Sequence, residues 1–172
     1  MKAIMPSMPD KATPWMTGKT PTSLVGAAGE HFVMTQLLLR GCQAALTPRG
    51  AAETDILVRN ADATVLAEIQ VKTRSGKGGQ GWRMSEKHEH VVRDSLFYCF
   101  VDFGADGWPV YVMRSSFVAD YLTSVHATYM AKPSRSGHPK KDWPGRFVSP
   151  HLPEPGWMEK HTARWDLITG SA

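Results

Sequence analysis

Two short apolar segments near the middle of the chain constrain its fold more than any other feature. The first runs from Asp55 to Val58 and the second from Val65 to Thr73, and a turn separates them, which is typical of two adjacent β-strands. Side chains alternate between the two faces of a strand, so Glu68, Gln70 and Lys72 share one face, opposite the apolar residues. Successive members of this polar row lie about 6.6 Å apart. The sequence therefore predicts an acid, an amide and an amine on one surface of a sheet.

The rest of the chain reads as helix, three strands, helix, two strands and helix, followed by a short terminal segment. Expected helices cover about 22–40, 85–93 and 115–126, with a short one within 157–168, and expected strands cover 43–46, 55–58, 65–73, 96–103 and 110–113. This order predicts an α/β sandwich with a mixed central β-sheet flanked by helices. We expect an N-terminal arm at 1–22, a core at 23–126, and an irregular excursion with a C-terminal segment packed on the core at 127–172.

Length and composition are those of a single globular domain. The chain has 172 residues, of which 42% are hydrophobic and 21% charged, and a net charge of +4 that suits a nucleic-acid partner without requiring one. Cys42 and Cys99 are too few for a disulfide framework and are expected to be reduced core thiols. There is no apolar run long enough to span a membrane, nor a secretory signal, so we expect a cytoplasmic protein without a membrane partner.

The polar row has the composition of a metal-dependent hydrolytic site. Hard divalent cations such as Mg²⁺ or Mn²⁺ prefer oxygen ligands, and phosphodiester cleavage needs a cation near the scissile phosphate. We expect Asp55 to be the main ligand, assisted by the Gln70 amide oxygen and the Val71 backbone carbonyl. Lys72 is expected to orient water or to stabilise charge on the phosphate. Glu30, on the edge of the first helix's core-facing stripe, is expected to complete the metal shell.

The same residues also have simpler interpretations. Asp55 and Lys72 could satisfy each other as an internal ion pair, and Glu30 could lie on a solvated flank of its helix. Glu68 is one alternate position before Gln70, so it could add a charge to the metal site or could be a peripheral charge at the edge of the sheet.

The ordered motifs resemble the PD-(D/E)xK nuclease superfamily, particularly small bacterial members with a Gln-x-Lys third motif. They are Gly26 to Glu30 on a helix, Asp55 to Val58, and Ile69 to Thr73. Holliday-junction resolvases and some intron-encoded homing endonucleases are similar in the order of these elements. The resemblance implies a restriction-endonuclease-like fold, magnesium-dependent cleavage and, in many members, a homodimer. Two departures stand out: Thr54 replaces the proline of the motif, and Gln70 replaces the usual acid, which lowers the charge available to a metal.

Basic residues surround the Lys72 end of the second strand and are candidates for contacts with backbone phosphates. They are Arg74, Lys77, Arg83 and Lys87. Trp82 could stack on a base or anchor its loop to the core. Farther along, Lys140, Lys141 and Arg146 occur near Trp143 and Phe147, which is the composition either of an auxiliary nucleic-acid patch or of an ordinary surface excursion.

These observations predict a metal-dependent nuclease that hydrolyses phosphodiester bonds, with DNA as the favoured substrate. The alternative is a nuclease-like fold with weak or lost cleavage that acts as a nucleic-acid or protein binding module, which Gln70 keeps open.

Overall fold

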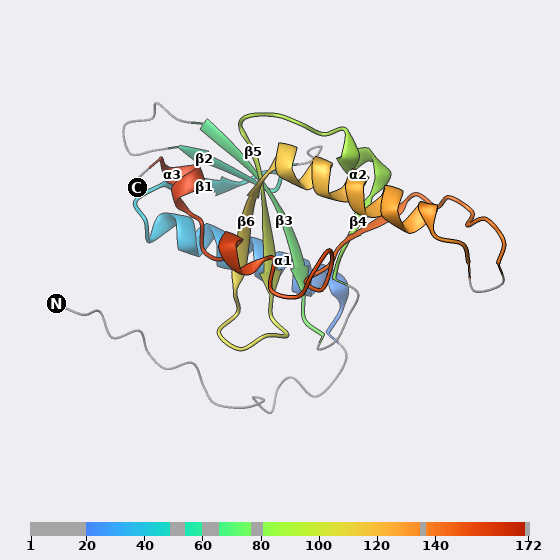
Figure 1. Ribbon diagram of the computed structural model, residues 1–172. Coiled ribbons are helices and arrows are strands. Elements are labelled where there is room, and N and C mark those ends of the chain that lie inside the picture. Colours follow the sequence, from blue (N-terminus) through green and yellow to red (C-terminus); the bar gives the residue numbers. More distant parts are fainter. Residues whose placement is uncertain (1–19, 49–53, 60–65, 77–80, 135–136, 171–172) are drawn as a thin grey trace.

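The computed structural model describes residues 20–48, 54–59, 66–76, 81–134 and 137–170. It contains a central mixed sheet with helices on both of its faces (Figure 1). The helices are α1 (Thr22–Leu38), α2 (Ser115–Ala131) and α3 (Asp166–Thr169), with short 3₁₀ helices η2 (Glu86–Glu89) and η3 (Glu159–His161). The strands are β1 (Gln43–Leu46), β2 (Ile56–Arg59), β3 (Leu66–Arg74), β4 (Trp82–Ser85), β5 (Leu96–Asp102), β6 (Val110–Arg114) and β7 (Gly145–Val148).

The central sheet has the order β1-β2-β3-β5-β6. All neighbouring strands are antiparallel except β3 and β5, which are parallel. The sheet is therefore mixed, as the sequence predicts, and the α/β sandwich is confirmed. Parallel pairing needs a crossover between the two strands, and the chain from β3 to β5 supplies it through β4 and η2.

Each face of the sheet has its own hydrophobic core, and the two long helices lie on opposite faces (Figure 1). On one face Val33 and Leu37 of α1 pack on Ile69 and Val71 of β3. On the other face Val118 and other residues of α2 pack on the alternate residues of β5. β5 is buried along its whole length because it is covered on both sides.

α1 begins at Thr22, where the sequence predicts the start of the first helix. Gly41, beyond the end of α1, adopts a left-handed φ of 81°. Cys42 and Cys99 are both free and buried, as expected. The arm expected at residues 1–22 lies outside the described part of the chain up to residue 19. No helix in the described ranges is long and apolar enough to cross a membrane.

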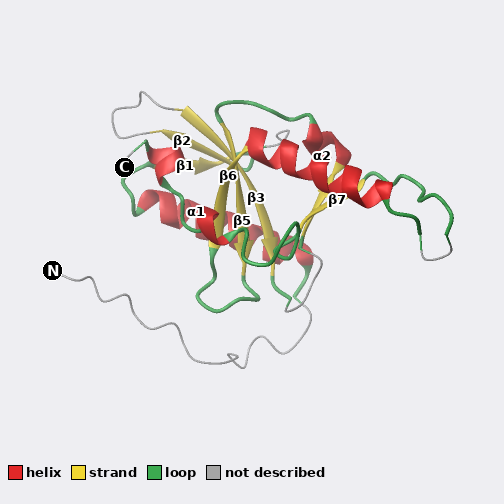
Figure 2. Cartoon of the chain, viewed as in Figure 1, coloured by secondary structure: helices red, strands yellow, loops and turns green. Residues whose placement is uncertain are grey.

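Two expectations were wrong. The helix expected at 85–93 is only the 3₁₀ turn η2, in which His88 is buried and hydrogen-bonded to Tyr98 (Nδ1 to Oη, 2.8 Å). The excursion after residue 127 is also more regular than expected. α2 continues to Ala131, and β7 pairs antiparallel with β4 in a second, two-stranded sheet beside α2 (Figure 2).

Candidate active site

The site forms where β2 ends and β3 continues without a neighbour on that side. Ile56 and Ile69 are the last paired residues of the two strands, and the Asp55 backbone N–H also donates to the Ile69 carbonyl at 2.8 Å. Backbone groups of alternate strand residues point to the same edge, so the N–H and C=O of Val71 face the side that β2 has left. These backbone groups of Val71 are therefore not paired with β2 and lie beside Asp55.

The Asp55 carboxylate occupies this free edge. Its Oδ2 atom accepts hydrogen bonds from the Val71 N–H and from the Gln70 side-chain Nε2, each at 2.7 Å. Within the ranges that the structure describes, nothing donates to the second oxygen, Oδ1, or to the Gln70 Oε1 atom. The Val71 carbonyl lies at the same edge of β3, because the backbone N–H of Val71 donates to Asp55 there. The Asp55 carboxylate, the Gln70 side chain and the Val71 backbone are thus brought together beside β3.

The Lys72 side chain lies on the same face of β3 as Gln70 and is half-buried. Burial lowers the pKa of its ammonium; the Asp55 carboxylate opposes this shift and the charge of Lys87 adds to it. Among the described residues its ammonium has no hydrogen-bond or ion-pair partner. The interpretation of Asp55 and Lys72 as an internal ion pair is therefore wrong, although the two charges lie close enough to interact.

Asp55 and Lys72 are half-buried, whereas Gln70 and Val71 are buried. The buried side-chain atoms that lack both solvent and a partner in the described ranges are elsewhere: Thr73 Oγ1, Arg74 Nε, Arg93 Nε and His161 Nε2. No three His, Cys, Asp or Glu side chains in the same ranges are grouped to hold a metal. Any cation at this edge would be held by one carboxylate together with amide and backbone oxygens.

Glu30 lies on α1, which packs on the face of the sheet opposite Gln70 and Lys72. The preceding residue, Gly29, packs so closely on β3 that a Cβ built there would lie 1.8 Å from Thr73 Oγ1. Glu30 itself is half-buried and already interacts with another group. The structure thus places Glu30 beside the end of β3, on α1, while Gln70 and Lys72 occupy the other face.

Glu68 belongs to a different cluster from Asp55. Its Oε2 accepts from Thr54 Oγ1 at 2.9 Å and from Arg93 Nη2 at 2.8 Å, and Oε1 accepts from Ser95 Oγ at 3.0 Å. Burial acts to raise its pKa, but the hydrogen bonds from Thr54 and Ser95 and the charge of Arg93 lower the pKa overall. Because both oxygens are occupied, Glu68 is unsuited to the additional metal-ligand role considered for it.

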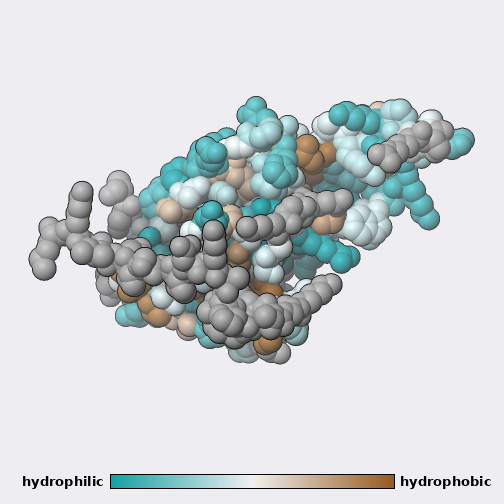
Figure 3. Space-filling model, turned by 90° about the horizontal axis from the view of Figure 1, so that it is seen from below, coloured by the Kyte–Doolittle hydropathy of each residue, from teal (hydrophilic) through white to brown (hydrophobic). Residues whose placement is uncertain are grey.

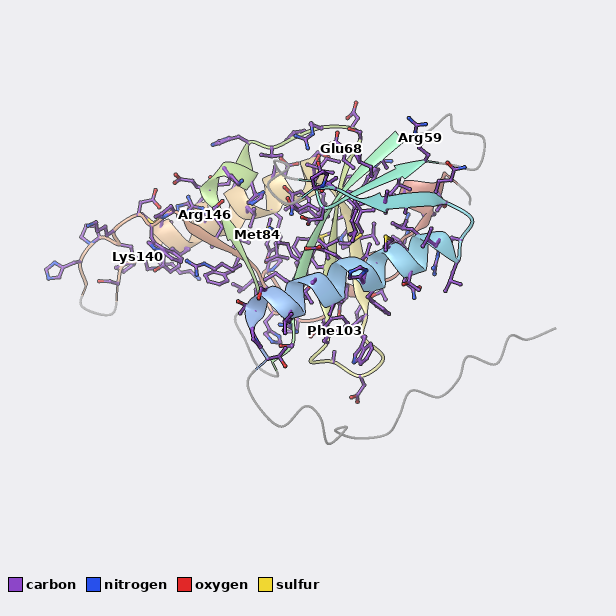
Figure 4. The ribbon with its side chains drawn as sticks, turned by 180° about the vertical axis from the view of Figure 1, so that it is seen from behind. Arg59, Glu68, Met84, Phe103, Lys140 and Arg146 are labelled. Atoms are coloured by element: carbon purple, nitrogen blue, oxygen red, sulfur yellow. The ribbon has the colours of Figure 1, made fainter. Side chains whose placement is uncertain are left out.

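This cluster positions Asp55, and no pattern in the sequence indicates it. Thr54, next to Asp55, is fixed through its hydroxyl to Glu68, and its carbonyl accepts from Thr47 Oγ1. The Asp55 backbone is held on both sides, since its carbonyl accepts from the Thr47 N–H at 2.9 Å. Thr54 thus anchors the acid that follows it. Figure 4 shows Glu68 on the sheet, away from Arg146 and Lys140.

The four basic candidates are placed differently. Arg74 forms a close ion pair with the buried Asp102 and lies over the Trp82 ring, so its guanidinium stabilises the end of the sheet. Lys77 lies outside the described residues. Arg83 and Lys87 are both exposed on β4 and η2, and Lys87 is the one whose charge reaches Lys72. Trp82 is buried and donates from Nε1 to the Val101 carbonyl at 2.9 Å, which confirms it as an anchor.

The chain is similar in fold to a solved structure. Neither a protein-family model nor a curated protein matches it. A solved structure, that of the bacterial homing endonuclease I-Ssp6803I, matches with a TM-score of 0.52 over 87% of this chain and 92% of the other, at 12% identity. At this identity the likeness establishes a shared fold, that of a nuclease.

Proposed function

We propose that this protein is a metal-dependent nuclease that hydrolyses phosphodiester bonds, with DNA as its favoured substrate. The observation that carries the proposal is the grouping of Asp55, Gln70 and the Val71 backbone beside Lys72 at the unpaired edge of β3. The likeness of the fold to a homing endonuclease supports the same class of function.

The donor set suits a hard divalent cation, Mg²⁺ or Mn²⁺. Asp55 Oδ1, Gln70 Oε1 and the Val71 carbonyl would hold it, and Glu30 would support the shell from α1. When bound, such a cation neutralises phosphate charge and makes a bound water more acidic. The hydrogen bonds from Gln70 and Val71 keep the Asp55 carboxylate oriented before any cation arrives.

Lys72 is the protein side chain that supplies positive charge at this site. Its ammonium is half-buried and has no partner in the described part of the chain, so it is available to donate to phosphate oxygens as negative charge develops there. The desolvated surroundings that lower its pKa also strengthen its interaction with a phosphate. Lys87 and Arg83 extend this positive charge along the outside of the protein, where they would contact neighbouring phosphates.

A second function has a specific observation in its favour. The neutral Gln70 replaces the acid expected at this position, and its Nε2 is engaged with Asp55. A site with less negative charge binds a cation more weakly, so the same fold could hold nucleic acid without cutting it.

Cleavage assays distinguish these functions. Purified protein is incubated with supercoiled plasmid, single-stranded DNA, branched DNA and RNA, each with Mg²⁺, Mn²⁺ or EDTA. The nuclease proposal predicts metal-dependent cleavage that Asp55→Ala and Lys72→Met each abolish. Asp106→Ala and Lys160→Met, which change an exposed acid and an exposed amine elsewhere, serve as matched controls and should cut normally. Binding without cleavage across all substrates would instead establish the binding module. Cleavage of RNA alone would show that RNA, rather than DNA, is the substrate.

Pairing of two copies is a further part of the proposal, since cutting both strands of a duplex uses two sites. Light scattering of the purified protein tests it, with a dimer expected and a monomer at all concentrations contradicting it.

A further inference from the structure

A concave surface lies on a part of the molecule that does not include β3. It is a cavity of about 700 Å³ between the second half of α2 and the chain from 141 to 153. Tyr129, Trp143 and Phe147 supply aromatic walls, and Lys132 and Lys141 supply positive charge. This part of the molecule projects from the body at the right of Figure 1, and in the view from below the projection is largely hydrophilic (Figure 3).

The aromatic rings are held in place yet open to solvent. Trp143 is 50% exposed and Tyr129 is 55% exposed. The Trp143 ring lies directly over Gly145, where an added Cβ would approach it to 1.8 Å, and the Trp143 carbonyl accepts a close hydrogen bond from Arg146. Arg146 is itself buried and paired with Glu89. The protein thus fixes an exposed indole without burying it.

The charges around the cavity are predominantly positive. Lys132 and Lys141 have no carboxylate partner among the described residues, whereas Asp142 is engaged by His126 at 3.1 Å and by Arg146 at 3.7 Å. Lys140 lies 3.6 Å from the centre of the Tyr129 ring, and Arg83 lies 5.8 Å from that of Trp143. Aromatic faces interleaved with unneutralised amines are the combination that holds single strands, because bases stack on rings while amines neutralise phosphates.

The cavity is also connected to the candidate active site. Glu86, at the start of η2, donates its N–H to the Pro144 carbonyl at 2.9 Å, which ties the loop of Trp143 to the turn that carries Lys87. Lys87 lies within electrostatic reach of Lys72.

We propose that this cavity binds a single-stranded segment of nucleic acid, with unpaired bases stacked on Trp143 and Tyr129 and phosphates beside Lys132 and Lys141. A duplex hides its base faces, so the surface would select unpaired nucleotides. The inference rests on the proposed function for its choice of nucleic acid as the partner.

Fluorescence anisotropy tests the inference with labelled oligo-dT of about 12 nucleotides and a duplex of equal length, both in EDTA. Trp143→Ala and Tyr129→Ala should each weaken oligo-dT binding between about 5-fold and 100-fold, and Trp143→Phe should restore most of it. Lys141→Gln should reduce the slope of log affinity against log salt by about 0.7, whereas Arg59→Gln, at the opposite end of the molecule from Lys140 in Figure 4, should not. Duplex binding should change less than twofold.

Gly145→Ala provides a second approach, because it displaces the Trp143 ring while keeping it present; it too should weaken oligo-dT binding. The inference is overturned if Trp143→Ala and Gly145→Ala bind oligo-dT within twofold of wild type. It is also overturned if these variants lose affinity for duplex and for single strand equally. Binding of polyglutamate in the cavity without binding of oligo-dT would overturn it as well. Cleavage is not required in this assay. Wild-type protein that binds through Trp143 but never cuts would overturn the nuclease alone, and protein that cuts but ignores Trp143 would overturn the cavity alone.

Discussion

The Gln70 side chain donates a 2.7 Å hydrogen bond to the carboxylate of Asp55, on a strand that runs antiparallel to its own. The amide nitrogen thus orients the neighbouring carboxylate, while the amide oxygen accepts no hydrogen bond from the described residues. An acid at the same position would bring a second negative charge beside Asp55, and under the proposed function a cation would offset it. We therefore expect the identity of residue 70 to set how strongly the proposed site depends on metal.

Gln70→Glu should make folding more dependent on a divalent cation. In EDTA the variant loses a hydrogen bond to a charged group and places two carboxylates together, so its free energy of unfolding should fall by about 1–3 kcal/mol. Adding Mg²⁺ should raise its melting temperature more than that of wild type. Gln70→Ala loses the bond without adding charge and separates the two effects. Equal stability and equal response to Mg²⁺ in wild type and Gln70→Glu would contradict this view of the site.

Lys72→Met should stabilise the protein at neutral pH while abolishing cleavage. The ordinary lysine pKa of 10.5 is lowered in the folded protein by burial, so between the two values the unfolded chain binds more protons and stability rises with pH. Methionine removes this titration. The gain in unfolding free energy over wild type should be full below the folded pKa and vanish as the pH approaches 10.5. Urea denaturation of both proteins across pH 7–10.5 measures it, and a gain that stays constant would refute it.

Glu68→Gln should weaken the fold but leave metal binding alone. The folded Glu68 pKa lies below its ordinary value of 4.5, so its contribution to stability is present above that value and is lost as the pH falls through the folded pKa. We expect a loss of about 1 kcal/mol at pH 7 that disappears in acid. Calorimetric titration with Mn²⁺ should give affinities within twofold of wild type. A large loss of metal affinity would return Glu68 to the metal site.

Gly29→Ala should separate α1 from β3. The new methyl group would meet Thr73, whose colliding atoms are attached directly to its own Cβ and cannot swing far, so a loss of about 2 kcal/mol is expected. Gly26→Ala is the matched control because nothing lies within 4 Å of its Cβ position, and it should gain up to about 1 kcal/mol from helix propensity. The two thermal denaturation curves should therefore shift in opposite directions, and a stable Gly29→Ala would show that the packing is loose.

The strands of the candidate site could be predicted because their signal is local. Alternation over β3 places Gln70 and Lys72 on one face whatever the rest of the chain does, and β2 follows from its apolar run. The grouping of Asp55 with Gln70 follows from the antiparallel pairing of these two short strands.

Features that depend on distant partners could not be predicted. β7 is only four residues long and forms because β4 lies beside it, and the β4 partner is far away in the sequence. The sequence left the role of Glu68 open because Arg93, which forms an ion pair with it, comes from a loop after η2. Arg74 looks like a phosphate ligand by composition, but burial of Asp102 at the end of β5 gives it a structural role.

We propose that oxygen atoms of Asp55, Gln70 and Val71 hold one divalent cation beside Lys72. Anomalous diffraction from crystals soaked in Mn²⁺ would locate this cation. We expect a single strong peak within coordination distance of Asp55 Oδ1, Gln70 Oε1 and the Val71 carbonyl, absent from crystals of Asp55→Ala. A map with no peak at this edge of β3, or with its peak on other residues while Asp55 stays bound only to Gln70 and Val71, would contradict it.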